Sequence, residues 1–289
     1  MTITALTTYR SLEFPNLLWL EAETADGVVG LGETFYAAEA VEAYIHANLA
    51  PIVLGMSAVD IEAVHYRTRP YIGFVAASTE LRARSALDIA LWDVLGKLTG
   101  QPISVLLGGR IRSQIPVYNT CAGNQYVRGT KLGTTQNFGI ASSGTDQNHE
   151  DLDRFLNDPV GLAGSLLDMG IDSMKIWPFD FAAESTQGQF ISPAELDKAL
   201  APFKAIKKEY GDRMQISAEL HGMWNLSESL IICQALDEIG MRWIEDPVFL
   251  TNPTGIQELK RTVRSRIAMG ETRGGADDFK IFLDTGALS

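Results

Sequence analysis

The first hundred residues combine strand-like and helix-like spacing of apolar side chains. Residues 2–9 and 17–22 carry short runs of β-branched and aromatic residues, which predict strands. An Asp-Gly dipeptide at residues 26–27 predicts a hairpin turn into a return strand at residues 28–31. Residues 78–98 place apolar side chains on one helical face and predict a long helix. This part of the chain therefore predicts a small α+β unit.

From about residue 115 the pattern alternates between short apolar strands and amphipathic helices. A Ser-Pro-Ala-Glu sequence at residues 192–195 is typical of a capped helix start. Repeated βα units indicate a parallel sheet, and both a β/α barrel and a doubly wound sheet fit. No glycine-rich phosphate-binding motif opens a helix, which argues against nucleotide binding. The predicted strands are residues 115–120, 173–176, 214–218, 241–244 and 266–269, and the predicted helices are residues 152–169, 192–210, 225–239 and 253–263.

A polar stretch at residues 122–147 is rich in Gly, Ser, Thr, Asn and Gln and predicts a long loop. It follows the first predicted strand of the alternating part, so we expect it on the active-site face. There it would cover substrate or pack against a neighbouring subunit. A surface insertion without either role is the alternative.

Composition excludes several classes of protein. The chain has 289 residues, with 46% hydrophobic residues and a formal net charge of −12, which is ordinary globular composition and opposite to a phosphate-tracking nucleic-acid binder. Cys121 and Cys233 lie far apart, so neither a disulfide framework nor a thiolate zinc site is expected. No basic and apolar leader precedes the first strand, and no apolar run approaches the ~18 residues of a membrane helix. We therefore expect a cytoplasmic protein that binds neither nucleic acid nor membrane.

Three glutamates recur at a constant spacing. Glu219, Glu245 and Glu271 are 26 residues apart, and each follows a predicted strand. In a parallel barrel such positions are neighbours on the C-terminal rim, where active sites form. Three carboxylates that converge there repel one another unless a cation joins them, and all-oxygen ligation suits Mg²⁺. The alternative is three separate, solvated loop acids.

Two further side chains lie near the same predicted rim. His221 follows Glu219 by two residues, so it is a candidate general acid or base, or else a further metal ligand or a hydrogen-bonded rim histidine. Lys175 ends the strand at residues 173–176, where a lysine neutralises a substrate carboxylate or acts as a base. A lysine that simply reaches solvent from the strand end is the alternative.

Four stretches of the sequence form a recognisable set: ARSALDIALWD at residues 83–93 with Gly-Lys at 96–97 and LLGG at 106–109, MKI at 174–176, WIEDP at 243–247, and Gly-Glu at 270–271. Together they resemble the mandelate racemase/muconate lactonizing enzyme group of the enolase superfamily. The resemblance implies an α+β capping domain at residues 1–112, followed at residues 113–289 by a (β/α) TIM-type barrel that carries the metal and catalytic site. We count about five of the eight barrel units in the sequence, so we expect a barrel that is incomplete at its C-terminus.

The resemblance implies that the three spaced glutamates are Mg²⁺ ligands in a reaction that begins with proton removal α to a carboxylate. Lys175 matches the first lysine of the family's Lys-x-Lys motif, and Trp177 replaces the second, which argues against a lysine-based racemase. The Glu-x-His arrangement resembles acid-sugar dehydratases in which the histidine protonates the departing hydroxyl, a role that falls here on His221. Asn119, Trp177 and Arg273 are candidate substrate contacts.

The function predicted from this resemblance is a Mg²⁺-dependent dehydratase that converts a sugar acid to a 2-keto-3-deoxy product. Members of the group are often dimers or octamers, so we expect a homo-oligomer. Such dehydratases take their base from a histidine on the seventh barrel strand, paired with an aspartate on the sixth, and neither strand is predicted here. Two alternatives stay open: a racemase or epimerase of a carboxylate, and a non-catalytic homologue that binds metal and an anion.

Length sharpens this interpretation. The predicted capping part uses about 112 residues, which leaves fewer than the roughly 250 of a complete barrel. We therefore expect the sequence to belong to a longer chain, with about 80–110 further residues in three more βα units and a return to the cap.

Overall fold

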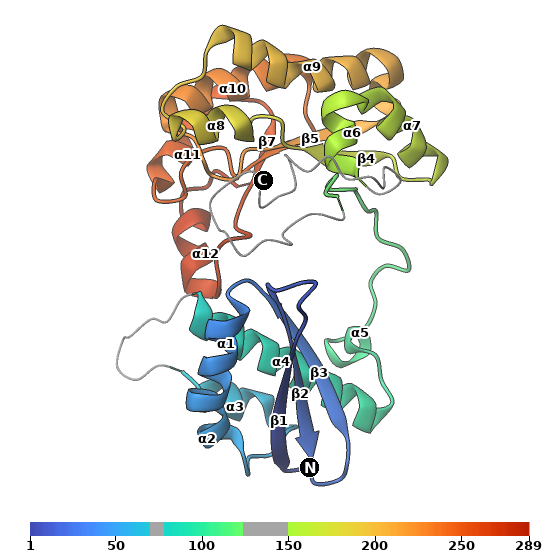
Figure 1. Cartoon of the computed structure of the whole chain (residues 1–289), viewed down its shortest axis with the longest axis vertical. Coiled ribbons are helices and arrows are strands. Elements are labelled where there is room, and N and C mark those ends of the chain that lie inside the picture. Colours follow the sequence, from blue (N-terminus) through green and yellow to red (C-terminus); the bar gives the residue numbers. More distant parts are fainter. Residues whose placement is uncertain (70–77, 124–149, 289) are drawn as a thin grey trace. The chain divides into compact units, whose positions relative to one another are not determined.

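The computed structural model describes residues 1–69, 78–123 and 150–288, and it separates into two compact units (Figure 1). Residues 1–115 form the first unit, and the described residues from Pro116 onward form the second. Each unit has its own hydrophobic core. Within the described residues no helix is both long and apolar enough to cross a membrane.

The first unit is built on an antiparallel sheet of three strands, β1 (Ile3–Arg10), β2 (Leu17–Thr24) and β3 (Val29–Phe35), in that order. The long helix α4 (Thr79–Thr99) packs against β2 and β3. Gly32 makes this close approach possible, because a Cβ there would collide with the carbonyl oxygen of Ala86 in α4.

Shorter helices complete the first unit beside α4 (Figure 1). Leu18 and Leu20 of β2 pack with Leu87 and Leu91 of α4 in one buried cluster, which is the core that the helical spacing predicts. The shorter elements are α1 (Ala38–Tyr44), the π-helix η1 (Ile45–Leu49), α2 (Ala50–Val53), α3 (Ile61–Arg67) and α5 (Ile103–Leu106).

The second unit contains a parallel sheet of four strands in the order β4 (Ser173–Ile176), β5 (Gln215–Glu219), β6 (Trp243–Glu245) and β7 (Arg266–Ala268). Helices connect the strands, so each crossover is a βα unit of the predicted kind. This confirms the predicted fold class, an α+β capping part followed by part of a β/α barrel. Adjacent strands run in register, with Glu219 opposite Glu245 and Glu245 opposite Ala268.

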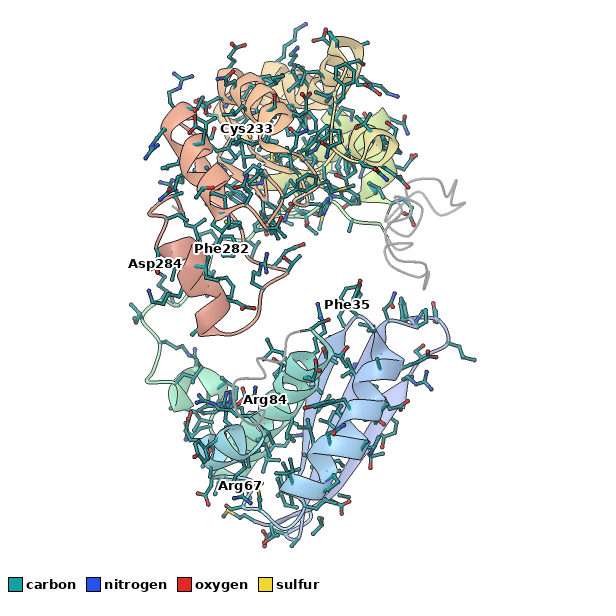
Figure 2. The ribbon with its side chains drawn as sticks, turned by 90° about the vertical axis from the view of Figure 1, so that its left-hand side faces the viewer. Phe35, Arg67, Arg84, Cys233, Phe282 and Asp284 are labelled. Carbon is teal, nitrogen blue, oxygen red and sulfur yellow. The ribbon has the colours of Figure 1, made fainter. Side chains whose placement is uncertain are left out.

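Local sequence signals set the helix ends of the second unit. Ser192 and Glu195 form the predicted capping box at the start of α9, and Asn225 caps α10 by accepting from the backbone N–H of Glu228. Cys233 of α10 (Figure 2) is buried in the core of this unit and is in no disulfide bond. The helices are α6 (Asp151–Asn157), α7 (Pro159–Asp168), α8 (Asp180–Thr186), α9 (Pro193–Tyr210), α10 (Leu226–Ile239), α11 (Pro253–Thr262) and α12 (Ala276–Leu283), with a 3-10 turn, η4 (Gly211–Arg213).

Two predicted elements differ from the structure. The strand predicted at residues 115–120 is reduced to one bridge between Asn119 and Met174, because the rest of this segment has no strand partner among the described residues. The single helix predicted at residues 152–169 is two helices. Pro159 lacks an N–H and cannot continue α6, so it opens α7 while Asp158 caps that helix.

Helix α8 was not predicted, and it matters for the site because Asp180 is its first residue. The loop predicted at residues 122–147 lies outside the described residues from position 124 onward, so its placement over the active-site face stays a prediction.

Candidate metal centre and active site

The three evenly spaced glutamates come together at the carboxyl ends of neighbouring strands. Glu219 ends β5 and Glu245 ends β6, and the two are register partners in the parallel sheet. Glu271 follows β7 after Gly270, whose φ of 123° is a conformation that other residues rarely adopt. One carboxylate oxygen from each glutamate lies within 4.8 Å of those of the other two. The three glutamates differ in burial: Glu219 is buried, Glu245 is half-buried and Glu271 is exposed.

Lys175 on β4 lies against two of these carboxylates. Its Nζ is 2.7 Å from Oε2 of Glu219 and 2.9 Å from Oε1 of Glu245, and only 5% of the residue is exposed. The ring of Tyr118 lies 5.8 Å from the ammonium. Burial acts to lower the pKa of Lys175, but the two carboxylates outweigh burial and raise that pKa above its ordinary value. Lys175 therefore carries a fixed positive charge next to the cluster.

Glu219 and Glu245 differ in what sets the pKa of each carboxylate. Burial raises the pKa of Glu219 above its ordinary value, although His221 and Lys175 oppose that effect. Burial also acts to raise the pKa of Glu245, but hydrogen bonds from Lys175 and from the Trp243 indole, whose Nε1 donates to Oε2 at 2.9 Å, lower it. Because burial makes the negative charge of Glu219 costly, the three oxygen donors fit a hard divalent cation that would compensate this charge.

His221 is held at the edge of the cluster by three contacts. Its backbone N–H donates to Oε1 of Glu219 at 2.9 Å, and its Nδ1 lies 2.9 Å from Oδ2 of Asp180. The ring of Trp177 meets the imidazole edge-on, with centroids 5.3 Å apart. The backbone of His221 has a φ of 50°, so the turn after β5 is tight. Burial acts to lower the pKa of His221, but Asp180 and the nearby glutamates raise it to about 9.

Asp180 is a site residue that no pattern in the sequence predicted. The residue follows β4 by four positions, at the same carboxyl end of the sheet as the glutamates, and this position was the available signal. No regular spacing marks it, because α8 is an additional short helix between β4 and α9.

Two candidate substrate contacts have protein partners near β4. Asn119 accepts a hydrogen bond from the backbone N–H of Cys121 and donates one to Asp151. Trp177 donates its indole N–H to the carbonyl of Thr120 and is almost fully buried. Trp177 therefore forms part of the wall behind His221, and the substrate role of both residues stays a prediction.

Arg273 lies two residues beyond Glu271. Its Nη2 donates to the carbonyl of Leu250 at 2.6 Å, and its guanidinium lies over the ring of Phe282, 5.2 Å from the centroid. These contacts tie the segment after β7 to neighbouring elements, and the predicted contact of Arg273 with substrate stays a prediction.

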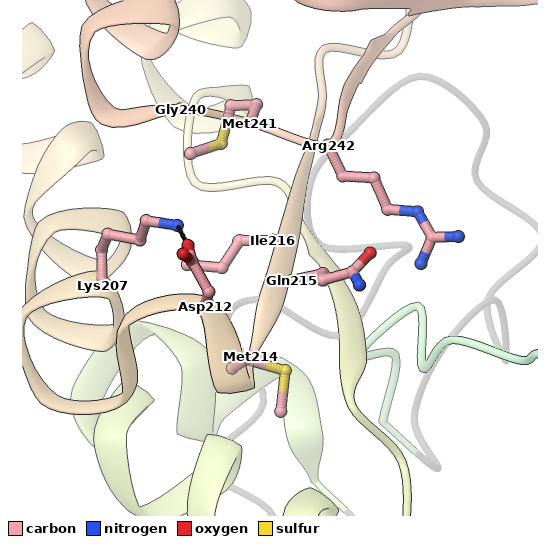
Figure 3. A pocket seen from close by; sticks show the side chains of 8 residues that line it. All are labelled: Lys207, Asp212, Met214, Gln215, Ile216, Gly240, Met241 and Arg242. Carbon is pink, nitrogen blue, oxygen red and sulfur yellow. Dashed lines mark hydrogen bonds and ion pairs between the residues drawn. The ribbon is translucent and has the colours of Figure 1, made fainter.

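A hollow of about 280 Å³ opens at the other end of the sheet, where β5 and β6 begin (Figure 3). Lys207 and Asp212 form an ion pair across one side of it at 2.8 Å. The glutamate cluster is at the opposite strand ends, and active sites of β/α barrels form at that carboxyl-terminal face and not at the amino-terminal one. The lining residues are Lys207, Asp212, Met214, Gln215, Ile216, Gly240, Met241 and Arg242.

Known protein families match both units. The N-terminal domain of mandelate racemase/muconate lactonizing enzyme matches residues 4–108, and the enolase C-terminal domain-like family matches residues 160–289. A D-galactonate dehydratase from Pectobacterium atrosepticum is 27% identical over 100% of this chain and 66% of its own length. A D-galactonate dehydratase from Variovorax paradoxus is 26% identical, again over 66% of its length. The chain thus spans just under two thirds of the length of these curated relatives.

A solved structure agrees with these matches. An enolase of the mandelate racemase subgroup from Agrobacterium tumefaciens is 39% identical, with a TM-score of 0.84 over 100% of this chain and 69% of that one. Its relatedness, together with the matches to both domain families, establishes the family. The chain belongs to the mandelate racemase/muconate lactonizing enzyme group of the enolase superfamily.

Proposed function

We propose that this protein is a Mg²⁺-dependent carbon–oxygen lyase that dehydrates a sugar acid to a 2-keto-3-deoxy acid. The observation that carries the proposal is the placement of His221 beside three converging glutamates. The similarity to two D-galactonate dehydratases supports the substrate class, an aldonate or aldarate, without naming the sugar.

Glu219, Glu245 and Glu271 would hold the metal ion through one oxygen each. A bound Mg²⁺ supplies positive charge beside a substrate carboxylate and so favours loss of the α proton. Lys175 adds a second positive charge at the same place. Because the carboxylates raise its pKa, Lys175 keeps its proton and suits charge neutralisation rather than proton removal.

His221 would act as the general acid. A base removes the α proton, the electron pair of that C–H bond forms the Cα–Cβ double bond, and the Cβ–O bond breaks as His221 protonates the departing hydroxyl. Water leaves, and the enol tautomerises to the 2-keto acid. We assign the base to none of the described residues.

The test is a panel of aldonates and aldarates incubated with the protein and Mg²⁺, with detection of 2-keto-3-deoxy acids. We expect turnover of at least one acid, loss of turnover in EDTA, and loss in the variant Glu245→Gln. Glu258→Gln is the matched control, since Glu258 is an exposed acid on α11. Solvent deuterium incorporation at Cα without water loss would instead indicate an epimerase. Absence of both reactions in a metal-loaded protein would contradict an enzymatic function.

We also propose a homo-oligomer, a dimer or an octamer, on the family resemblance. Light scattering of the purified protein tests this directly, and a monomer at micromolar concentration would contradict it.

A further inference from the structure

A buried aspartate accompanies the candidate general acid. Asp180 is 1% exposed, and its Oδ2 lies 2.9 Å from Nδ1 of His221. Its other oxygen, Oδ1, is also buried and has no hydrogen-bond partner in the part of the chain that the structure describes. The hydrogen bond with the imidazole of His221 therefore offsets part of the cost of burying the charge of Asp180.

Such an arrangement is poor for stability. A buried carboxylate with one unpartnered oxygen costs free energy, and an apolar residue of similar size avoids that cost. Glu184 on the same helix adds to the cost, because the burial of Asp180 and the charge of Glu184 both act to raise the pKa of Asp180. A role at His221 explains why an acid occupies this position.

We propose that Asp180 is a positioning residue that holds the imidazole of His221 through Nδ1, so that proton transfer to the substrate takes place at Nε2. The inference rests on the proposed dehydratase function for the identity of the proton acceptor. Two other contacts restrict the same ring. The edge-on contact with Trp177 restricts the plane of the imidazole. The hydrogen bond from the backbone N–H of His221 to Glu219 fixes the backbone from which the ring projects.

The chemical consequence concerns which nitrogen carries a proton after transfer. When Nε2 gives its proton to the departing hydroxyl, the Cβ–O bond breaks and water leaves. The ring is then neutral, with its remaining proton on Nδ1 and directed at Oδ2 of Asp180. A carboxylate in this place stabilises that tautomer, whereas an amide can present an N–H to Nδ1 and favour the other one.

The first experiment needs no turnover. In ¹⁵N-histidine-labelled protein, the Nδ1 proton of His221 should give a downfield, hydrogen-bonded resonance, assigned by its loss in His221→Asn. We expect Asp180→Asn and Asp180→Ala to remove or shift this resonance. The matched control Glu209→Gln should keep it, since Glu209 is an exposed acid on α9. Circular dichroism and the Tm establish that each variant is folded.

The second experiment measures kinetics with an accepted sugar acid. Asp180→Asn should lower kcat by about 10- to 100-fold while KM and Mg²⁺ affinity change by less than about threefold. The loss should narrow to less than about threefold when fluorine replaces the β-hydroxyl of the same substrate, because fluoride leaves without a full proton transfer. A general loss of packing would lower kcat equally for the hydroxyl substrate and for its fluorinated analogue.

An Nδ1 resonance unchanged in folded Asp180→Asn, or a kcat loss that is the same for hydroxyl and fluoride, would overturn the positioning role. If the resonance depends on Asp180 but no sugar acid is dehydrated, the proposed function fails while the hold on His221 stands. The two failures are therefore distinguishable.

Discussion

Replacing Lys175 by methionine tests the electrostatic account of the cluster. The change keeps the length of the side chain but removes the charge that lies 2.7 Å from Glu219 and 2.9 Å from Glu245. These carboxylates are register partners on adjacent strands, so they cannot move apart without disturbing the sheet. In metal-free protein, the variant leaves two neighbouring acids without their shared cation.

The magnitude follows from the burial of the group. Breaking a buried ion pair by removing one partner costs about 3–5 kcal/mol of unfolding free energy. For a unit of this size, 1 kcal/mol corresponds to roughly 2–4 °C, so Lys175→Met should lower the Tm by about 6–20 °C in EDTA. Saturating Mg²⁺ should recover a larger part of the Tm in the variant than it adds to the wild type, because the ion compensates the same carboxylates.

Differential scanning fluorimetry with EDTA and with a Mg²⁺ titration provides the measurement. Lys207→Met is the control, since Lys207 pairs with a fully exposed aspartate and its loss should leave the Tm nearly unchanged. A loss below about 1 kcal/mol in EDTA, or an equal loss with and without Mg²⁺, would refute the reasoning.

Three further predictions follow from other contacts. Trp243→Phe removes the indole donor to Glu245 and should weaken Mg²⁺ binding about tenfold by calorimetry, with unchanged affinity contradicting a role for this hydrogen bond. The pKa of Asp237 lies below its ordinary value, because hydrogen bonds from Ser265 and nearby backbone N–H groups outweigh the burial that acts to raise it. Above pH ~4, the unfolded-state pKa of aspartate, the free energy of unfolding of wild type should therefore be about 1.5–3 kcal/mol larger than that of Asp237→Asn. This difference should disappear as the pH falls through the lower folded-state pKa, and a difference in urea melts that does not change with pH would be contrary evidence. Gly32→Ala forces a Cβ into α4 and should cost about 1–3 kcal/mol in the first unit, measured by its chemical denaturation; a neutral result would mean that β3 and α4 separate readily.

The spacing of the glutamates was predictable because a βα unit repeats the position of its strand end. Glu219 and Glu245 occupy that end and Glu271 follows it closely, so a period in the sequence becomes proximity in space. The helix caps at Ser192 and Asn225 were predictable for a similar reason, since their signals involve residues only three positions apart.

Features that depend on contacts between distant segments were not predictable. The pairing of Asp180 with His221 joins residues 41 positions apart, and no period links them. The simultaneous contact of Lys175 with two glutamates depends on strand order, which the sequence does not encode locally. Residues 115–120 have a composition that favours a strand, but within the described structure this segment forms only one bridge, between Asn119 and Met174. Composition alone therefore predicted more strand than the segment forms.

The backbone holds the three glutamates with unequal rigidity, and this bears on which cation the proposed site would prefer. Hydrogen bonds of the sheet fix the separation of Glu219 and Glu245, whereas Glu271 is attached beyond the end of β7 and is exposed. The carboxylates of Glu219 and Glu245 are therefore held rigidly, whereas that of Glu271 can change position. Mg²⁺ binds oxygen at about 2.0–2.1 Å and Ca²⁺ at about 2.3–2.6 Å, so in the proposed metal site a change of ionic radius would be absorbed mainly by the side chain of Glu271. If the three glutamates hold the metal as proposed, discrimination between ions of different size would depend on how firmly the segment after Gly270 holds the side chain of Glu271.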